Sequence, residues 1–110
     1  RVLVLGLAFK ENCPDLRNTR VVDIIAELAQ FNAQVDVHDP WVDAGLAHEE
    51  YGLAVTAQPE PGAYDAVILA VSHREFIALG ADGVRGFGKP GAVLFDVKGV
   101  LPRDTVDGRL

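Results

Sequence analysis

Two long cationic side chains, Lys10 and Arg17, follow a glycine near the start of the chain, where they could bind an anion. An apolar run ends at Gly6, a loop follows, and helical spacing of apolar residues begins at Val21. Backbone N–H groups at a helix start have no partners within the helix and carry partial positive charge. A strand, a glycine turn and a helix start commonly bind anions. The pattern therefore predicts a ligand that carries phosphate.

This loop matches neither of two common nucleotide-binding motifs. It lacks the G-K-S/T of a Walker loop and the G-x-G-x-x-G of a dinucleotide fingerprint. A dinucleotide-binding half also needs an acidic residue about 20 residues beyond its glycines. Asp36 and Asp39 lie considerably farther from Gly6. We therefore do not expect this loop itself to bind a dinucleotide.

Strands alternate with helices along the chain. Five short segments, rich in apolar residues or bounded by turn residues, are predicted strands: 1–6, 34–38, 53–55, 66–71 and 92–97. Alternation of this kind predicts an α/β fold, a three-layer Rossmann-like domain with a parallel sheet of about five strands and helices on both faces. Residues 1–110 are long enough for one such domain.

Three helices are expected between these strands. Asn18 is the predicted N-cap of the first, although Asp15 could start that helix one turn earlier, and 43–50 forms a weak second helix. Ser72 and Glu75 match the S-x-x-E capping box, so the third helix should begin at Ser72, with His73 in its first turn.

Ligands of parallel α/β sheets bind beyond the carboxyl ends of the strands. The loops after the first, fourth and fifth predicted strands are therefore the candidate site. They contain Lys10, His73 and Lys98.

Composition excludes several classes of partner. The net charge of −6 disfavours nucleic acid, and no apolar run of about eighteen residues predicts a membrane span. The single cysteine, Cys13, cannot form an internal disulfide, which fits the reducing cytoplasm. No metal site is expected, because His38 and His48 lack ligand spacing with Cys13.

Four blocks of sequence together resemble one family. The run GLAFKENCPDLRNTR resembles the opening of the C-terminal, UDP-binding domain of the UDP-glucose/GDP-mannose dehydrogenase family, and is most similar to bacterial UDP-N-acetylglucosamine 6-dehydrogenases of surface-polysaccharide synthesis. The blocks VDVHDPWVD, YDAVILAVSHREF and LFDVKGVL keep the family's order and spacing. Such a resemblance over nearly the whole chain is stronger than any single motif.

The resemblance implies a role for four residues. Phe9 and Lys10 correspond to the family's Phe-Lys pair, which contacts the nucleotide sugar. Lys98 occupies a basic position on the sugar nucleotide where many members have arginine, and lysine keeps the charge but loses the bidentate fork. Arg17 corresponds to an arginine that reaches the cofactor NAD, held by the neighbouring domain.

Plainer roles remain open for these residues. Lys10 could be an ordinary solvated lysine, and Phe9 could pack under its loop. Arg17 could form a salt bridge to Asp15 or Asp39. Asp96 is expected to orient the Lys98 loop rather than to catalyse.

Cys13 lies near cations and a helix start, where a cysteine can become a nucleophile. The family's catalytic cysteine, however, belongs to a Gly-rich motif earlier in the full chain. Cys13 is therefore expected to be a small buried loop residue, and no residue of this chain is expected to be catalytic.

By resemblance, the whole enzyme is an NAD-dependent UDP-sugar 6-dehydrogenase that oxidises the C6 alcohol of a UDP-sugar to a carboxylate for polysaccharide biosynthesis. NAD would be bound mainly by an N-terminal domain, the full-length enzyme would be a homo-oligomer, and this part alone would be inactive. The alternative is a free-standing nucleotide-binding or regulatory module. A phosphoacceptor receiver domain is disfavoured, because it needs acidic residues where this chain has Gly6-Leu7-Ala8.

Overall fold

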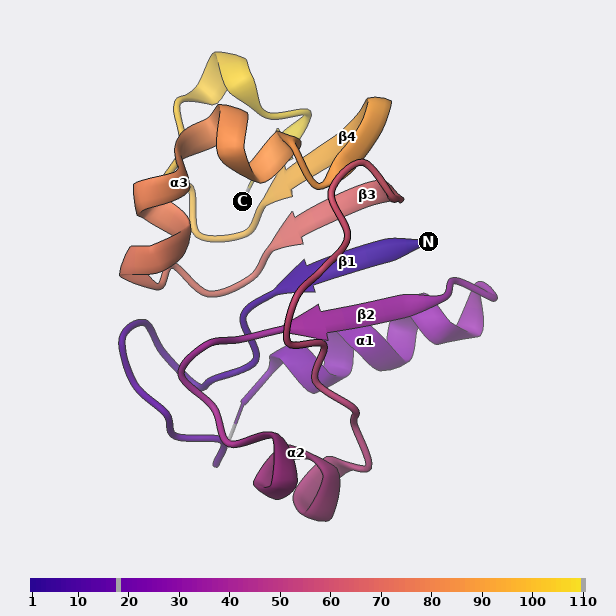
Figure 1. The fold of residues 1–110 in the computed structure, drawn as a ribbon, viewed down its shortest axis with the longest axis vertical. Coiled ribbons are helices and arrows are strands. Elements are labelled where there is room, and N and C mark those ends of the chain that lie inside the picture. The colour runs from indigo at the N-terminus through magenta and orange to yellow at the C-terminus, as the bar shows by residue number, and fades with distance from the viewer. Residues whose placement is uncertain (18, 110) are drawn as a thin grey trace.

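A computed structural model of the chain describes residues 1–17 and 19–109. Its strands form one parallel sheet in the order β2-β1-β3-β4-β5 (Figure 1). The strands are β1 (Val2–Leu5), β2 (Val35–His38), β3 (Tyr64–Leu69), β4 (Gly88–Asp96) and β5 (Gly108–Arg109). The helices are α1 (Val21–Gln30), α2 (Ala44–Tyr51), α3 (Arg74–Arg85) and the short 3-10 helix η1 (Arg103–Thr105).

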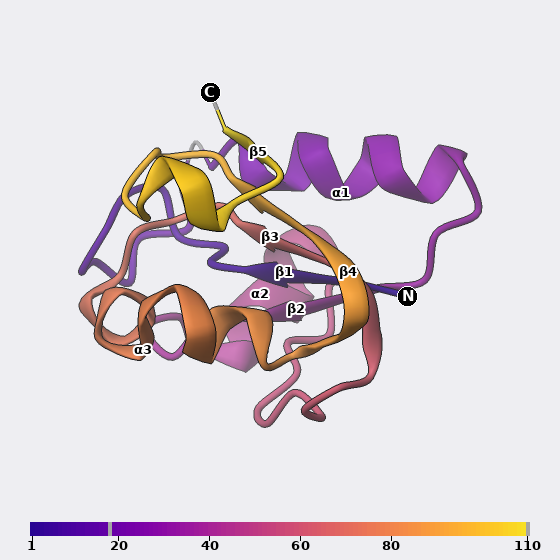
Figure 2. The same cartoon turned by 90° about the horizontal axis from the view of Figure 1, so that it is seen from above.

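Helices α1 and α3 cover opposite faces of the sheet (Figure 2). The chain passes from β1 through α1 outward to β2, and from β3 through α3 outward to β4. The order of strands therefore reverses between β1 and β3, the point at which open α/β sheets bind ligands. Helix α2 lies beyond the β2 edge (Figure 1). The predicted α/β fold with helices on both faces is confirmed.

Alternating side chains of β1, which lies between β2 and β3, belong to two different hydrophobic clusters. Leu3 and Leu5 belong to the α3-side cluster, whereas Val4 belongs to the α1-side cluster. The α3 side also buries Phe76 and Val84 from its helix. Each fully buried side chain of this size contributes roughly 1.5–3 kcal/mol. Both faces of β1 are therefore packed in the core, which fixes the position of the loop that follows its carboxyl end.

Two predicted elements differ from the structure at the sheet edges. Residues 53–55 do not form a strand; Val55 makes a single parallel bridge to Val37. The fifth strand is instead β5, whose two residues are too few to give a sequence pattern. The predicted N-cap Asn18 lies outside the described residues. No helix in the described part of the chain is long and apolar enough to cross a membrane.

The third helix does not use the predicted capping box. It begins at Arg74 rather than Ser72, and the Glu75 carboxylate accepts a hydrogen bond from Trp41 Nε1–H at 2.7 Å. The cap comes from a distant loop, because Asn12 Oδ1 accepts from the Arg74 N–H at 2.8 Å. A capping box is a local pattern and cannot reveal a cap supplied from another loop.

Candidate functional site

The three residues predicted to bind substrate line one groove at the carboxyl edge of the sheet. The groove has a volume of about 390 Å³ and lies where the strand order reverses between β1 and β3. Four segments contribute to it: the loop after β1, the start of α1, the residues that directly follow β3 and the loop after β4. Its lining residues are Ala8, Phe9, Lys10, Arg20, Val21, Ile24, Ala70, Val71, Val97 and Lys98.

The groove combines buried apolar side chains with exposed cations. Val71 is buried, whereas Lys10, Lys98 and Arg20 are exposed, and Phe9 is 49% exposed. Arg20 is a cation that the sequence analysis did not single out; its guanidinium lies 3.9 Å from the Asp23 carboxylate. Apolar surface beside several cations suits a ligand with both a ring and an anionic group.

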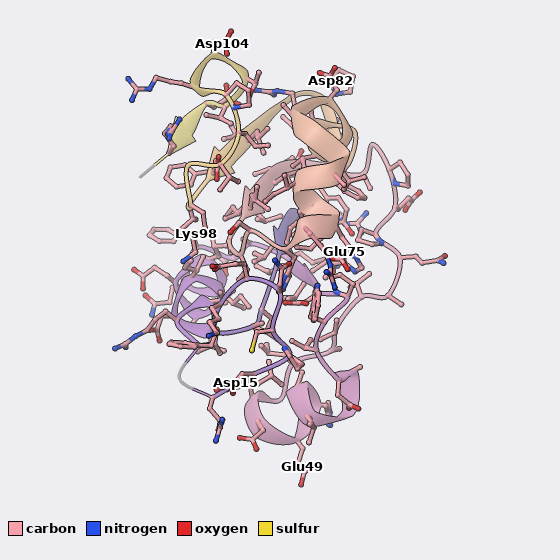
Figure 3. The ribbon with its side chains drawn as sticks, turned by 90° about the vertical axis from the view of Figure 1, so that its left-hand side faces the viewer. Asp15, Glu49, Glu75, Asp82, Lys98 and Asp104 are labelled. Atoms are coloured by element: carbon pink, nitrogen blue, oxygen red, sulfur yellow. The ribbon has the colours of Figure 1, made fainter. Side chains whose placement is uncertain are left out.

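Figure 3 looks onto this edge of the sheet. Lys98 lies on the α1 side of the edge, whereas Glu75 lies on the α3 side and Asp15 lies toward α2. The part of the groove that Lys98 lines therefore lies on the α1 side of the edge, away from Asp15.

Gly6 makes the close turn out of β1. Its φ of +103° lies in the left-handed region, and a Cβ added there would approach Val71 Cβ to 2.5 Å and Val71 N to 2.8 Å. Only glycine fits this contact between the β1 and β3 loops. The turn thus brings Lys10 and the end of β3 into the same groove.

The backbone amides of this turn already bind an anion, which is the carboxylate of Asp39. Asp39 Oδ2 accepts hydrogen bonds from the Leu7 N–H at 2.7 Å and the Ala8 N–H at 2.9 Å, and Asp39 is 3% exposed. This corrects the expectation that the turn itself would take a ligand phosphate. The glycine turn does bind an anion, but an internal one, so the groove's cations are side chains.

Asp39 has two further donors. Its Oδ1 accepts from the Trp41 N–H at 2.8 Å, and its Oδ2 lies 2.9 Å from His73 Nε2. Burial, the largest single influence, raises the pKa of Asp39. The hydrogen bonds from His73 and from three amides together outweigh burial and hold that pKa below its ordinary value. Asp39 is therefore a fully paired buried carboxylate.

His73 links Asp39 to the next part of the loop. It is completely buried, and its Nδ1 accepts from the Asn12 N–H at 2.9 Å, so the ring proton is on Nε2 and is donated to Asp39. The ring stacks on Trp41 at 5.9 Å and tilts against Phe76 at 5.7 Å. His73 is the N-cap residue of α3, not the first-turn residue expected from the sequence.

Arg17 lies outside the groove. It lines a second cavity of about 620 Å³ with Cys13, Trp41 and Leu46, among others. Arg17 Nε and Nη2 donate to the Asp15 carboxylate at 3.1 and 3.2 Å, and this pairing holds the pKa of Asp15 below its ordinary value. The salt bridge to Asp15 considered above is therefore present, although the Arg17 side chain is 85% exposed and faces solvent.

The loop that carries Lys98 is shaped by Asp96. This carboxylate is completely buried; its Oδ1 accepts from the Gly99 N–H at 2.9 Å and its Oδ2 from the Leu101 N–H at 2.7 Å. The prediction that Asp96 orients this loop is confirmed.

Residues 3–103 match the model of the UDP-glucose/GDP-mannose dehydrogenase family, UDP binding domain. The chain belongs to this family.

Two curated members of the dehydrogenase family show how much of a full-length relative the chain represents. It is 57% identical to the UDP-N-acetyl-D-glucosamine 6-dehydrogenase of Pseudomonas aeruginosa and 49% identical to that of Salmonella typhi. These matches cover 100% and 99% of the chain, but only 26% of each relative. The chain therefore spans about a quarter of the length of these relatives.

Solved structures of dehydrogenases share the fold. The UDP-D-ManNAc dehydrogenase of Pyrococcus horikoshii has a TM-score of 0.72 at 21% identity, over 98% of this chain and 24% of the other. The UDP-N-acetyl-mannosamine dehydrogenase Cap5O of S. aureus has a TM-score of 0.71 at 24% identity, over 98% of this chain and 25% of the other.

Two further features of this dehydrogenase-family domain correct the sequence analysis. Cys13 is only half-buried and lines the second cavity, whereas a small buried loop residue was expected. A G-x-G-x-x-G string does occur, at 86–91, although it was not singled out. Its residues 88–91 are the start of β4, at the amino edge of the sheet, whereas a dinucleotide fingerprint follows a strand and opens a helix. Among the described residues, no cluster of three or more His, Cys, Asp or Glu could hold a metal.

The contact between Asp39 and His73 in this family member was not predicted from the sequence. A usable signal was present: an aspartate directly after the second strand and a histidine shortly after the β3 strand. Because both strands are parallel, both side chains had to reach the same edge of the sheet.

Proposed function

We propose that residues 1–110 form one UDP-sugar-binding domain of an NAD-dependent UDP-sugar 6-dehydrogenase. The groove that holds Phe9, Lys10 and Lys98 would bind the UDP part. The observation that carries this proposal is the convergence of those residues, from two loops far apart in the sequence, on one groove at the strand-order reversal. The whole protein would oxidise the sugar C6 alcohol to a carboxylate for polysaccharide biosynthesis.

The groove offers matching groups for a nucleoside diphosphate. The ammonium groups of Lys10 and Lys98 would pair with the diphosphate oxygens through charge-assisted hydrogen bonds. The half-exposed ring of Phe9 offers apolar surface to the remainder of the nucleotide. Because the chain carries a net charge of −6, this local cluster of cations must attract the anion against the overall field.

UDP-N-acetylglucosamine is the UDP-sugar that we favour as substrate. Both relatives described above are named as UDP-N-acetyl-D-glucosamine 6-dehydrogenases, at 57% and 49% identity. At identities of this size the chain is more similar to those enzymes than to the ManNAc dehydrogenases of known structure, at 21% and 24%.

The cofactor NAD would be bound mainly outside this domain. The turn amides after β1, which hold the pyrophosphate in a dinucleotide-binding half, donate here to Asp39, so this turn does not fit NAD. Arg17 is the residue that we propose to reach the cofactor, since it is exposed and faces a cavity separate from the groove. We further propose a homo-oligomeric full-length protein in the cytoplasm, which suits the single free Cys13.

Titration of the ¹⁵N-labelled chain with UDP tests the groove. Backbone shifts should cluster at residues 7–18 and 96–99. Lys10→Ala should weaken binding at least tenfold, because a charge-assisted hydrogen bond is worth roughly 1.5–3 kcal/mol. Lys98→Arg should bind nearly as the wild type, since its charge and approximate reach remain.

Lys89→Ala is the matched control for charge. Lys89 pairs with Asp65 at 3.1 Å at the amino edge of the sheet, away from the groove, and its removal should leave UDP binding unchanged. Shifts that cluster elsewhere, or equal loss of affinity in the Lys10 and Lys89 variants, would overturn the proposal.

A further inference from the structure

We infer that Asp39 and His73 are a positioning pair for Lys10. Together they fix both ends of the loop tip, residues 9–11, which presents Lys10 to the groove. The inference rests on the proposed role of Lys10. Neither side chain of the pair is among the residues that line the groove, so their effect on a ligand would pass through the loop.

Asp39 holds the first end of the tip. Its Oδ2 accepts from the amides of Leu7 and Ala8 at 2.7 and 2.9 Å, and these residues lead directly into Phe9. Asp39 itself follows β2, and the Trp41 N–H donates to its second oxygen. The carboxylate therefore ties the start of the tip to a strand of the sheet.

His73 holds the second end of the tip. Its Nδ1 accepts from the Asn12 N–H at 2.9 Å, and Asn12 has a left-handed φ of 54°. The Asn12 side chain also caps α3 through the Arg74 N–H at 2.8 Å. An additional backbone bond, from the Phe9 N–H to the Asp15 carbonyl at 2.7 Å, closes the loop behind the tip.

One imidazole ring connects the two ends. His73 donates from Nε2 to Asp39 at 2.9 Å and accepts at Nδ1, so its two nitrogens contact the two attachment points of the tip. Trp41 and Phe76 lie against the ring, and it is 0% exposed, so the ring cannot turn without disrupting its neighbours. Loss of the ring leaves the Asn12 N–H without its acceptor and Asp39 without one of its donors.

A double-mutant cycle on UDP affinity tests this coupling in the chain. His73→Ala should weaken UDP binding about tenfold when Lys10 is present, and less than twofold in the Lys10→Ala background, because residues that act through one another are not additive. Val84→Ala is the stability control. Val84 is fully buried on α3 and away from the loop, so this variant should lose stability and keep its UDP affinity.

Two conservative variants separate the two contacts of the ring and serve if the alanine variant does not fold. His73→Gln can still donate toward Asp39, whereas His73→Asn can still accept near Asn12. Each should bind UDP more tightly than His73→Ala and more weakly than the wild type. Hydrogen exchange of the Asn12 amide should be slow in the wild type and Val84→Ala, and fast in His73→Gln.

The outcomes separate this inference from the proposed function. If Lys10→Ala binds UDP as the wild type does, the proposed role of Lys10 is wrong. Two results would refute the positioning role and leave the proposed function standing, provided that Lys10→Ala weakens UDP binding. In the first, the His73 variants bind UDP as the wild type does. In the second, they weaken UDP binding equally with Lys10 present and in the Lys10→Ala background.

Discussion

Replacing Asp39 with asparagine should destabilise the domain by roughly 2–4 kcal/mol. Asp39 Oδ2 takes three donors and Oδ1 takes one, the Trp41 N–H. An asparagine carbonyl can replace only one of these oxygens. If it replaces Oδ2, the amide NH₂ faces the part-buried Trp41 N–H, and that donor loses its acceptor at a cost toward the lower end of the roughly 1–3 kcal/mol of a buried donor.

The loss of charge adds to this effect. Hydrogen bonds to an ionised group are about twice as strong as neutral ones, so the three bonds that remain each become weaker. The absence of a buried charge offsets part of that loss, because the carboxylate must be desolvated on folding and the amide carries no charge. The sum is a large share of the roughly 5–15 kcal/mol that stabilises a typical domain.

Urea unfolding of the wild type and Asp39→Asn measures this loss of stability. Trp41 is the only tryptophan of the chain and stacks on His73, so its fluorescence reports on the site. With a slope of about 1–3 kcal/mol/M, a loss of roughly 2–4 kcal/mol should lower the midpoint by roughly 0.7–4 M. Asp43→Asn is the matched control: Asp43 is the exposed N-cap of α2, where asparagine caps as well as aspartate. If both variants unfold at the wild-type midpoint, the assigned role of the Asp39 carboxylate is refuted.

Four further predictions concern pH and other positions. Because the folded-state pKa of Asp39 is lowered, its contribution to stability is present above the ordinary pKa of about 3.9 and is lost as pH falls through the folded pKa. Asp39→Asn should therefore lose stability less steeply than the wild type in acid. Equal slopes of unfolding free energy against pH, from urea titrations at several pH values, would contradict this. Gly6→Ala should cost roughly 2 kcal/mol or more in thermal unfolding, since its Cβ would lie 2.5 Å from a neighbouring side chain, and an unchanged Tm would argue against that contact. In the full-length protein, Cys13→Ser should leave turnover within a few-fold, whereas a fall of orders of magnitude would identify Cys13 as the nucleophile. Lys10→Ala should raise KM for the UDP-sugar and Arg17→Ala should raise KM for NAD, as steady-state kinetics with each substrate varied would show. If the Arg17 variant has an unchanged KM for NAD, the role of Arg17 is only the salt bridge to Asp15.

The pattern of apolar residues was sufficient to predict the main strands of the sheet and the loops at their ends. Continuous apolar runs identified β1, β3 and β4, because strands of a parallel sheet are buried on both faces and need no polar alternation. The loops at their carboxyl ends followed from the topology, which is why Lys10 and Lys98 could be placed at one edge before the structure was known.

Contacts between distant loops could not be predicted in the same way. Asn12 caps α3 from a separate loop, and the local capping pattern at Ser72 therefore indicated the wrong start. Likewise the sequence around the glycine turn predicted an external anion, because those residues do not reveal that the Asp39 carboxylate accepts from the turn amides. Such pairings depend on which loops the sheet brings together, and a single sequence shows residue types but not these distances.

The attachment of residues 9–11 at both ends has a thermodynamic consequence for any ligand of Lys10. Fixing the backbone of one residue costs roughly 1–2 kcal/mol in conformational entropy, so ordering three residues on binding would subtract roughly 3–6 kcal/mol from affinity. In this domain folding has already ordered them through Asp39 and His73. Association should therefore follow the kinetics of a preorganised site, with a fast on-rate that depends on ionic strength rather than on a loop rearrangement.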